Sequence, residues 1–260
     1  MNAREALAES ERRLAVAGVE TPRVDAELLL AHTLGTTRGG VYAQLDREVD
    51  RGWESLLARR EAREPLAYVL GEWGFRRLTL KTDARALVPR PETEIVVERA
   101  LALVAEASSP RMLDVGVGSG AIALALKDER PDAHVVGVDV SDEALSLARE
   151  NAERLGLDVE LRLGDVDDAD AGWDLVVSNP PYVDTLEGLQ PELRYEPRPA
   201  LIGVGFHERI ARVARTGALV LEVGDGQAEE VAAILAASGY SGVAVTRDLT
   251  GVERVVEGRR

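Results

Sequence analysis

The spacing of apolar residues along the chain changes twice. In residues 1–65 the apolar positions recur with the helical period. Thr21 followed by Pro22 is typical of a helix start, and Gly35 of the end of the same helix. A further helix is expected to stop at Pro65. These residues are predicted to form a small all-α domain that either engages a partner or only packs.

Residues 66–90 have a different pattern. Apolar and aromatic side chains there repeat nearer to the strand period than to the helical period: Tyr68, Leu70, Trp73, Phe75, Leu78 and Leu80. Gly71 and Gly74 interrupt the run. A β-hairpin linker is therefore expected between the helical domain and the rest of the chain.

From residue 91 to 260 strands and helices alternate. Short apolar runs such as 112–115 and 175–177 read as buried parallel strands, and the segments between them have the helical period. Strands expected at 241–247 and 253–257 are joined by so short a loop that they must pair antiparallel. This alternation predicts an α/β domain, a doubly wound sheet with helices on both faces.

Composition narrows the function. The formal net charge of −15 and the presence of only two lysines disfavour unassisted binding to duplex DNA. The absence of cysteine excludes disulfides, thiolate metal sites and a cysteine nucleophile. The three histidines lie in separate segments, so no metal site is expected. No apolar run resembles a leader peptide or a membrane span, and a soluble cytoplasmic protein is expected.

A glycine-rich loop, Asp114–Gly120, follows the first strand of the α/β domain. It fits a loose G-x-G-x-x-A dinucleotide fingerprint, and equally the D-x-G-x-G-x-G loop that resembles the nucleoside-binding turn of S-adenosylmethionine (SAM)-dependent methyltransferases. Asp139 ends the second strand and is placed to accept hydrogen bonds from a ribose. Asp165 ends the third and would lie near an adenine. Each is otherwise an ordinary surface carboxylate.

The sequence Asn179-Pro180-Pro181-Tyr182 ends the fourth strand, where open α/β sheets bind ligands. The prolines fix the backbone and offer carbonyl acceptors without N–H donors. Together with the Asn179 side chain they suit a planar –NH2 group, against which Tyr182 can lie. Asn-Pro is also a common turn signal. A dehydrogenase has no need of these acceptors, whereas an amino-group methyltransferase does.

These motifs and their surroundings resemble the HemK/PrmC family of protein-(glutamine-N5) methyltransferases. Besides the two motifs above, the resemblance rests on several stretches: Tyr68-Val69-Leu70-Gly71, Val88-Pro89-Arg90-Pro91-Glu92-Thr93-Glu94, Glu196-Pro197, Ala200-Leu201 and Leu221-Glu222-Val223-Gly224. It covers essentially the whole chain. It implies a Rossmann-like class I fold with a mostly parallel seven-stranded sheet and one C-terminal antiparallel strand.

The resemblance also implies a reaction and its residues. A methyl group would pass from SAM, leaving S-adenosyl-L-homocysteine, to the glutamine of the Gly-Gly-Gln motif in peptide chain release factors. A monomer is expected, without membrane or nucleic-acid partners. The implied catalytic residues are Asn179, Pro180 and Tyr182. The implied cofactor contacts are Asp114, Gly116, Val117, Gly118, Ser119, Gly120, Asp139, Asp165, Val166 and Asn179. The implied substrate contacts are Phe75, Arg90, Glu92, Asn179, Pro180, Pro181 and Tyr182.

The sequence departs from the family pattern at two places. Residues 201–206 are shorter than the usual glycine-rich segment and lack its Asp-Gly, which puts substrate handling there in question. Val117 stands where the family commonly has Thr. Four alternatives remain: a glutamine methyltransferase of a ribosomal protein, a methyltransferase of nucleic-acid amino groups such as adenine N6, a non-catalytic SAM-binding protein, and a nicotinamide-dependent oxidoreductase.

Overall fold

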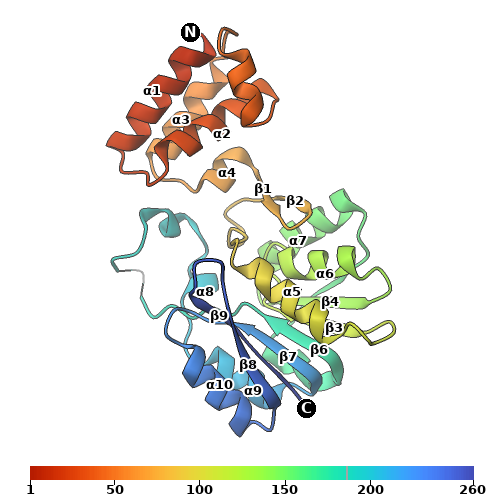
Figure 1. Cartoon of the computed structure of the whole chain (residues 1–260). Helices are drawn as coiled ribbons and strands as arrows, with labels where there is room; N and C mark the ends of the chain where they lie inside the picture. The colour runs from red at the N-terminus through yellow and green to blue at the C-terminus, as the bar shows by residue number, and fades with distance from the viewer. Residues whose placement is uncertain (186) are drawn as a thin grey trace. The chain divides into compact units, whose positions relative to one another are not determined.

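The chain forms two compact units in the computed structural model, which describes residues 1–185 and 187–260 (Figure 1). The first unit is Met1–Glu72 with Leu189–Tyr195, and the second is Trp73–Gly188 with Glu196–Arg260. No sequence pattern predicts that the short segment Leu189–Tyr195 packs with the N-terminal helices.

The regular elements of the first unit up to Gly71 are helices, and one isolated antiparallel bridge joins Asn2 to Glu48. Its elements are α1 (Ala3–Val16), α2 (Pro22–Leu34), η1 (Gly39–Gln44), α3 (Gly52–Glu61), α4 (Leu66–Leu70) and η3 (Pro191–Tyr195). Gly35 ends α2 in the left-handed conformation with φ 63°, as the sequence predicts. Leu29, Leu30 and Leu57 are fully buried and form the centre of this unit's core.

The segment just before the hairpin is a helix, and here the predicted strand period was wrong. Tyr68 and Leu70 lie in α4, which begins after Pro65 and ends at Gly71. The Pro65 carbonyl accepts the N–H of Tyr68 over 2.9 Å, and Gly71 takes φ 77°, which only glycine adopts easily. The hairpin, β1 (Glu72–Phe75) and β2 (Leu78–Lys81), therefore starts later than expected.

The second unit contains a seven-stranded sheet of strand order β5-β4-β3-β6-β7-β9-β8. Its strands are β3 (Arg111–Val115), β4 (His134–Asp139), β5 (Glu160–Leu163), β6 (Trp173–Ser178), β7 (Thr216–Glu222), β8 (Ser241–Arg247) and β9 (Glu253–Arg259). Strand β9 pairs antiparallel with both β7 and β8, while the pairs from β5 to β7 are parallel. The predicted fold class, including one antiparallel C-terminal strand, is confirmed.

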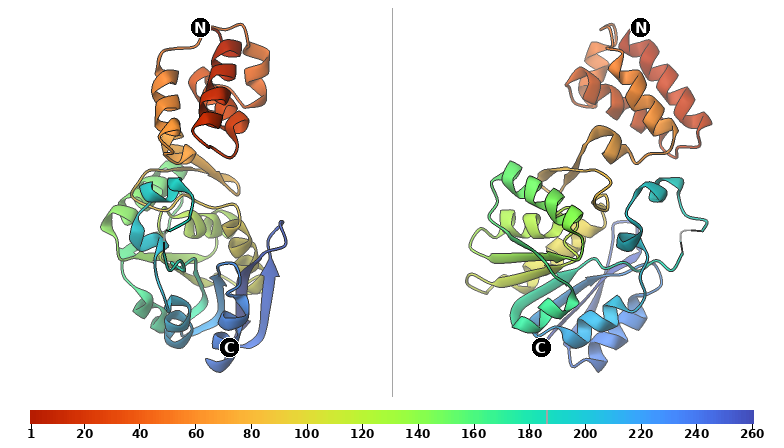
Figure 2. Two further views of the ribbon diagram at one scale, coloured as in Figure 1. Left: turned by 90° about the vertical axis from the view of Figure 1, so that its left-hand side faces the viewer. Right: turned by 180° about the vertical axis from the view of Figure 1, so that it is seen from behind.

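Helices cover both faces of this sheet. They are α5 (Thr93–Leu103), α6 (Ala121–Glu129), α7 (Asp142–Leu155), η2 (Val166–Ala171), α8 (Arg198–Leu201), α9 (Phe206–Val213) and α10 (Ala228–Ala237). Helices α5, α6 and α7 lie on one face, and α9 and α10 on the other (Figure 2). Two apolar cores result, because β3, β4, β6 and β7 send alternate side chains to opposite faces.

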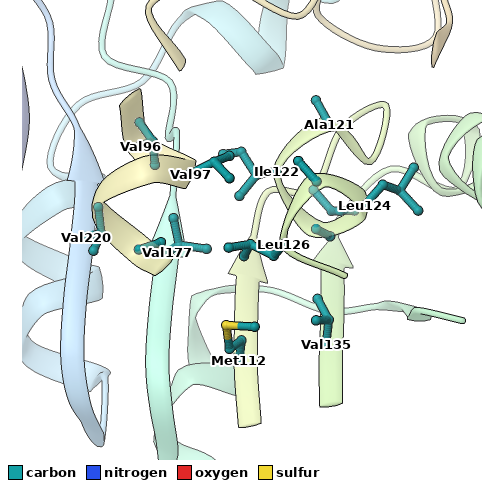
Figure 3. Close-up of a cluster of buried hydrophobic side chains, with 14 of the residues drawn as sticks. Val96, Val97, Met112, Ala121, Ile122, Leu124, Leu126, Val135, Val177 and Val220 are labelled. Atoms are coloured by element: carbon teal, nitrogen blue, oxygen red, sulfur yellow. The ribbon is translucent and has the colours of Figure 1, made fainter. Parts of the chain in front are cut away.

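The core between the sheet and α5 and α6 is built from small and branched aliphatic side chains (Figure 3). The labelled residues are Val96, Val97, Met112, Ala121, Ile122, Leu124, Leu126, Val135, Val177 and Val220. Aliphatic packing of this kind follows from the aromatic content of 4%. It fixes α5 and α6 against the strands that lead into the site.

The strand order reverses at β3, which pairs with β4 on one side and β6 on the other. Val115 at the end of β3 lies opposite Ser178 at the end of β6. The loop after β3 and the turn after β6 therefore leave the sheet side by side, at the switch point where open α/β sheets bind ligands. Within the part of the chain that the structure describes, no helix is long and apolar enough to span a membrane.

Candidate active site

A cavity of about 350 Å3 lies at this carboxyl edge of the sheet. Most of the residues expected at the site line it: Arg90, Gly116, Val117, Gly118, Ser119, Asp139, Asp165, Val166, Asn179, Pro180 and Pro181. Asp114, Gly120, Phe75, Glu92 and Tyr182 are not part of its lining. The cavity unites the loop and the turn that sequence analysis singled out separately.

The loop after β3 turns through three glycines in left-handed backbone conformations. Gly116, Gly118 and Gly120 have φ values of 77°, 55° and 89°, which strain other residues. The N–H groups of Gly116 and Val117 both donate to the Val138 carbonyl at 2.9 Å, so the loop is anchored to β4. The Val117 side chain is 4% exposed, which explains why an apolar residue is accepted between the glycines.

Asp114 lies beneath this loop and is buried. Its Oδ2 accepts the Ala123 N–H over 3.1 Å, whereas its Oδ1 is buried without a hydrogen-bond partner in the described residues. Burial raises the pKa of Asp114 to about 7, although the Ala123 hydrogen bond opposes the shift. This oxygen is fully buried and Asp114 does not line the cavity, so the carboxyl group lies beneath the loop and not at its ligand-facing surface.

Two further carboxylates lie at the strand ends as predicted. Asp139 accepts the N–H groups of Gly118 and Ser141, both over 2.9 Å, and thereby ties β4 to the glycine loop. Asp165 accepts the Val166 N–H over 2.7 Å and pairs with Arg209 over 2.9 Å. Each carboxylate keeps lone pairs for the hydroxyl and amino groups of a nucleoside. Together with the glycine turn, these two acceptor groups at the cavity fit SAM.

The turn after β6 is held from several sides. Ser178 donates its hydroxyl to the Val115 carbonyl over 2.6 Å, and the Asn179 Nδ2 donates to Thr93 Oγ1 over 3.3 Å. The Tyr182 hydroxyl donates to Glu222 Oε1 over 3.4 Å. Burial raises the pKa of Tyr182, and the Glu222 charge adds to the shift, so the phenol stays protonated at neutral pH.

Tyr182 is also fixed by the segment that follows β7. Gln227 donates its side-chain amide to the Tyr182 carbonyl over 3.2 Å, and its Oε1 accepts the Gly224 N–H over 2.9 Å. A Cβ on Gly224 would lie 2.9 Å from Tyr182 Cδ2, so a side chain there would displace the ring. The glycine of the Leu-Glu-Val-Gly stretch thus leaves room for the tyrosine.

Arg90 and Val88 are held by a buried glutamate. Glu196 accepts the Val88 N–H over 3.0 Å and pairs with Arg90 Nη2 over 2.5 Å, and its side chain is 1% exposed. Arg90 and Glu196 are 106 positions apart in the chain. The Pro-Arg-Pro-Glu and Glu-Pro stretches that contain them therefore meet at the site. Glu92 precedes α5 as its N-cap residue and is partly exposed.

Phe75 does not wall the cavity, contrary to the expectation. It is 1% exposed and packs in the core with Leu78, Leu80 and Val96. Phe75 lies on the buried face of the hairpin, together with Leu78 and Leu80. Its role is therefore to pack the hairpin on the sheet domain.

Sequence reasoning missed two residues beside the turn, Thr93 and Glu222. The sequence motifs assigned neither residue a role at the site. Thr93 Oγ1 donates to Glu222 Oε2 over 2.6 Å, and both residues are buried. The signal available was only their presence in stretches that resemble the family, because no local pattern pairs residues 129 positions apart.

Two family models match the chain. The PrmC N-terminal domain matches residues 5–71, and the methyltransferase small domain matches residues 94–191. A release factor glutamine methyltransferase from Deinococcus radiodurans is 44% identical over the whole of this chain and 99% of its own length. The chain belongs to the release factor glutamine methyltransferase family. Enzymes of the same name from Geobacter sulfurreducens and Escherichia coli are 42% and 39% identical, each match covering more than nine tenths of both chains.

Solved structures agree on the fold. The hMettl16 catalytic domain in complex with an RNA hairpin has a TM-score of 0.58 at 17% identity, covering 83% of this chain and 84% of that one. A Thermus thermophilus 16S rRNA N2 G1207 methyltransferase in complex with AdoMet and guanosine has a TM-score of 0.52 at 18% identity. That match covers 73% of this chain and 49% of the other. The fold is that of class I SAM-dependent methyltransferases, and the family uses SAM.

Proposed function

We propose that this chain transfers a methyl group from SAM to the side-chain amide nitrogen N5 of the glutamine in the Gly-Gly-Gln motif of peptide chain release factors. The observation that carries the proposal is the Asn179 carboxamide at the edge of the cavity. Its Nδ2 is engaged by Thr93, which leaves Oδ1 as an acceptor beside the acceptor-only peptides of Pro180 and Pro181.

An amide nitrogen is a poor nucleophile because its lone pair is delocalised into the carbonyl. The Asn179 Oδ1 and the Pro180 carbonyl would accept its two N–H bonds and hold it in line with the methyl group. SAM bound in the cavity supplies that methyl on an electrophilic sulfonium. Positioning of this kind lowers a barrier by up to about 7–11 kcal/mol. The transfer would leave the neutral thioether S-adenosyl-L-homocysteine and a positively charged amide nitrogen, which is acidic enough to give its proton to water or to Asn179 without a strong general base.

The remaining site residues have supporting roles in this proposal. Asp139, Asp165 and the glycine loop would hold SAM, Asp114 would support the loop from beneath, and Tyr182 would lie against the substrate amide. Arg90, fixed by Glu196, would contact the substrate protein. The N-terminal helical unit would engage the release factor. We propose further that the enzyme acts as a monomer in the cytoplasm, where release factors act.

The test is methyl transfer from labelled SAM to a purified release factor, beside a Gly-Gly-Gln to Gly-Gly-Ala control. Label is expected on the wild-type factor alone. The Asn179→Ala enzyme should bind SAM normally and lose at least about a hundredfold in kcat. Unchanged turnover in that variant would sink the assignment, and no label despite SAM binding would redirect the search to ribosomal proteins and nucleic acids.

A further inference from the structure

Three side chains form a hydrogen-bonded line behind the Asn-Pro-Pro-Tyr turn. Asn179 donates to Thr93 Oγ1 over 3.3 Å, and Thr93 donates to Glu222 Oε2 over 2.6 Å. They come from the end of β6, the start of α5 and the end of β7. Thr93 is 4% exposed and Glu222 is 0% exposed, so water cannot substitute for either partner.

The number of protons in this line dictates its direction. A carboxylate only accepts hydrogen bonds, and a threonine hydroxyl carries one proton. With Glu222 ionised, that proton lies on the 2.6 Å contact, and Thr93 can only accept from Asn179. The Asn179 amide group must then face Thr93 with its NH2, and its Oδ1 is directed away from Thr93.

We propose that Thr93 and Glu222 are positioning residues that fix the orientation of the Asn179 carboxamide, so that its oxygen rather than its NH2 faces the substrate amide. The inference rests on the proposed function and deepens it. The same carboxylate accepts from the Tyr182 hydroxyl, so one buried group sets the geometry of both polar side chains of the turn.

Loss of the charge on Glu222 would reverse the line. If the Tyr182 hydroxyl keeps the one carbonyl oxygen as its acceptor, a neutral acid or amide at this position must donate to Thr93 Oγ1, and the threonine proton is then free for Asn179 Oδ1. The carboxamide would turn over and present N–H groups to the N–H groups of the substrate. Two donors facing each other form no hydrogen bond, so turnover falls while the cavity for SAM is unchanged.

The surroundings make this charge sensitive to pH. Burial raises the pKa of Glu222 to about 7, and the negative charge of Glu92 also raises it. The hydrogen bonds from Thr93 and Tyr182 and the positive charge of Arg254 on β9 lower it. The His207 Nε2 on α9 lies 2.8 Å from the Glu222 backbone oxygen, and burial lowers the pKa of that imidazole, which stays neutral. Turnover should therefore rise as the pH passes through about 7 and Glu222 ionises.

Paired substitutions test the role of the threonine hydroxyl. Thr93→Val removes the hydroxyl at constant volume, and kcat for methylation of the release factor should fall about a hundredfold with the SAM Kd unchanged. Thr93→Ser restores the hydroxyl and should recover kcat to within about threefold. Thr216→Val is the matched control, because it deletes a buried threonine hydroxyl at the opposite end of β7. It should lower Tm without changing kcat.

A second arm addresses Glu222 and does not need a substrate. The side-chain amide NMR signal of Asn179, assigned by its absence in Asn179→Ala, should shift with pH around 7 in the wild-type protein. It should not titrate in Glu222→Gln, whose kcat should fall like that of Thr93→Val. In the Asn179→Ala background, Thr93→Val should cause no additional loss.

Each outcome bears on the inference. An Asn179 signal that ignores pH and is unmoved in Thr93→Val would overturn it, whatever the substrate is. So would a Thr93→Val enzyme with wild-type kcat, or an additive loss in the Asn179→Ala background. No methylation of the release factor by the wild-type enzyme would instead overturn the proposed function, and the NMR arm would still decide the orientation of Asn179.

Discussion

Replacing Gly137 with alanine should loosen the cofactor loop although Gly137 itself does not line the cavity, because the added methyl group would press on Val117, which does. Gly137 lies in β4, and a Cβ there would be 2.6 Å from Val117 Cγ2 and 2.9 Å from Leu161 Cδ2. Carbon atoms pack best at about 3.5–4.0 Å, so the neighbours must move by roughly 1 Å. Leu161 is partly exposed and can rotate, whereas Val117 is buried and stiff at χ1.

Overpacking of a filled core costs about 1–3 kcal/mol. Because Val117 donates its own N–H to Val138, its side chain cannot retreat without moving the backbone that faces the cavity. If about 1.4 kcal/mol of this cost is lost from the free energy of SAM binding, the SAM Kd rises about tenfold. The melting temperature should fall by about 2–4 °C for each kcal/mol lost. Calorimetric titration with SAM and a thermal melt measure the two effects.

Two controls separate this steric effect from a general one. Gly74→Ala adds a methyl group to a position where no other atom lies within 4 Å, and should leave the SAM Kd unchanged. Adding Val117→Ala to Gly137→Ala removes the atom that clashes and should restore SAM affinity. Wild-type affinity in Gly137→Ala alone would refute the reasoning, because Val117 would then not hold the loop.

Two other predictions concern the turn and the buried acid. In Gly203→Ala the new Cβ would lie 2.8 Å from Pro181 Cγ and 2.7 Å from the Phe206 ring. The turn should shift, and kcat should fall about tenfold or more with the SAM Kd unchanged. A wild-type kcat in this variant would contradict the prediction that this contact positions the turn. The pKa of Asp114 is raised to about 7, so its contribution to stability is present below its unfolded pKa of about 4 and is lost as the pH rises through about 7. Asp114→Asn stays neutral, and its Tm should fall less between about pH 5 and about pH 8 than that of the wild type; parallel melting curves would contradict this.

The fold was largely predictable because its signals are local. Short apolar runs predicted the strands, and Gly35 ends α2 as expected. Helix α7 has equally local boundaries, because the Ser141 hydroxyl accepts the Ala144 N–H and Gly156 follows its last residue. The error at α4 has the same origin. A helix of five residues is too short for the helical period to show, and Pro65 and Gly71, which delimit it, also fit the boundary of a hairpin.

The cavity was predictable to the extent that strand ends converge. The glycine loop and the Asn-Pro-Pro-Tyr turn each follow a buried strand, and the reversal of strand order brings them together. The prediction that Phe75 contacts the substrate was wrong because an aromatic residue in a hairpin has the same sequence pattern whether it faces a core or a cavity. Only the packing of the hairpin against Val96 and its neighbours decides between the two.

Thr93 and Glu222 show where sequence reasoning reaches its limit. Each residue alone has an ordinary explanation, one as a helix-start residue and the other as an acid at the end of a strand. Their meaning lies in a contact between positions 129 apart, and in the proton count of a line that also includes Asn179. A buried carboxylate without a cation as its direct hydrogen-bond partner is costly to keep ionised. That cost is understandable if the charge sets the direction of hydrogen bonds at the turn, since a neutral residue of the same shape would leave the carboxamide free to turn over.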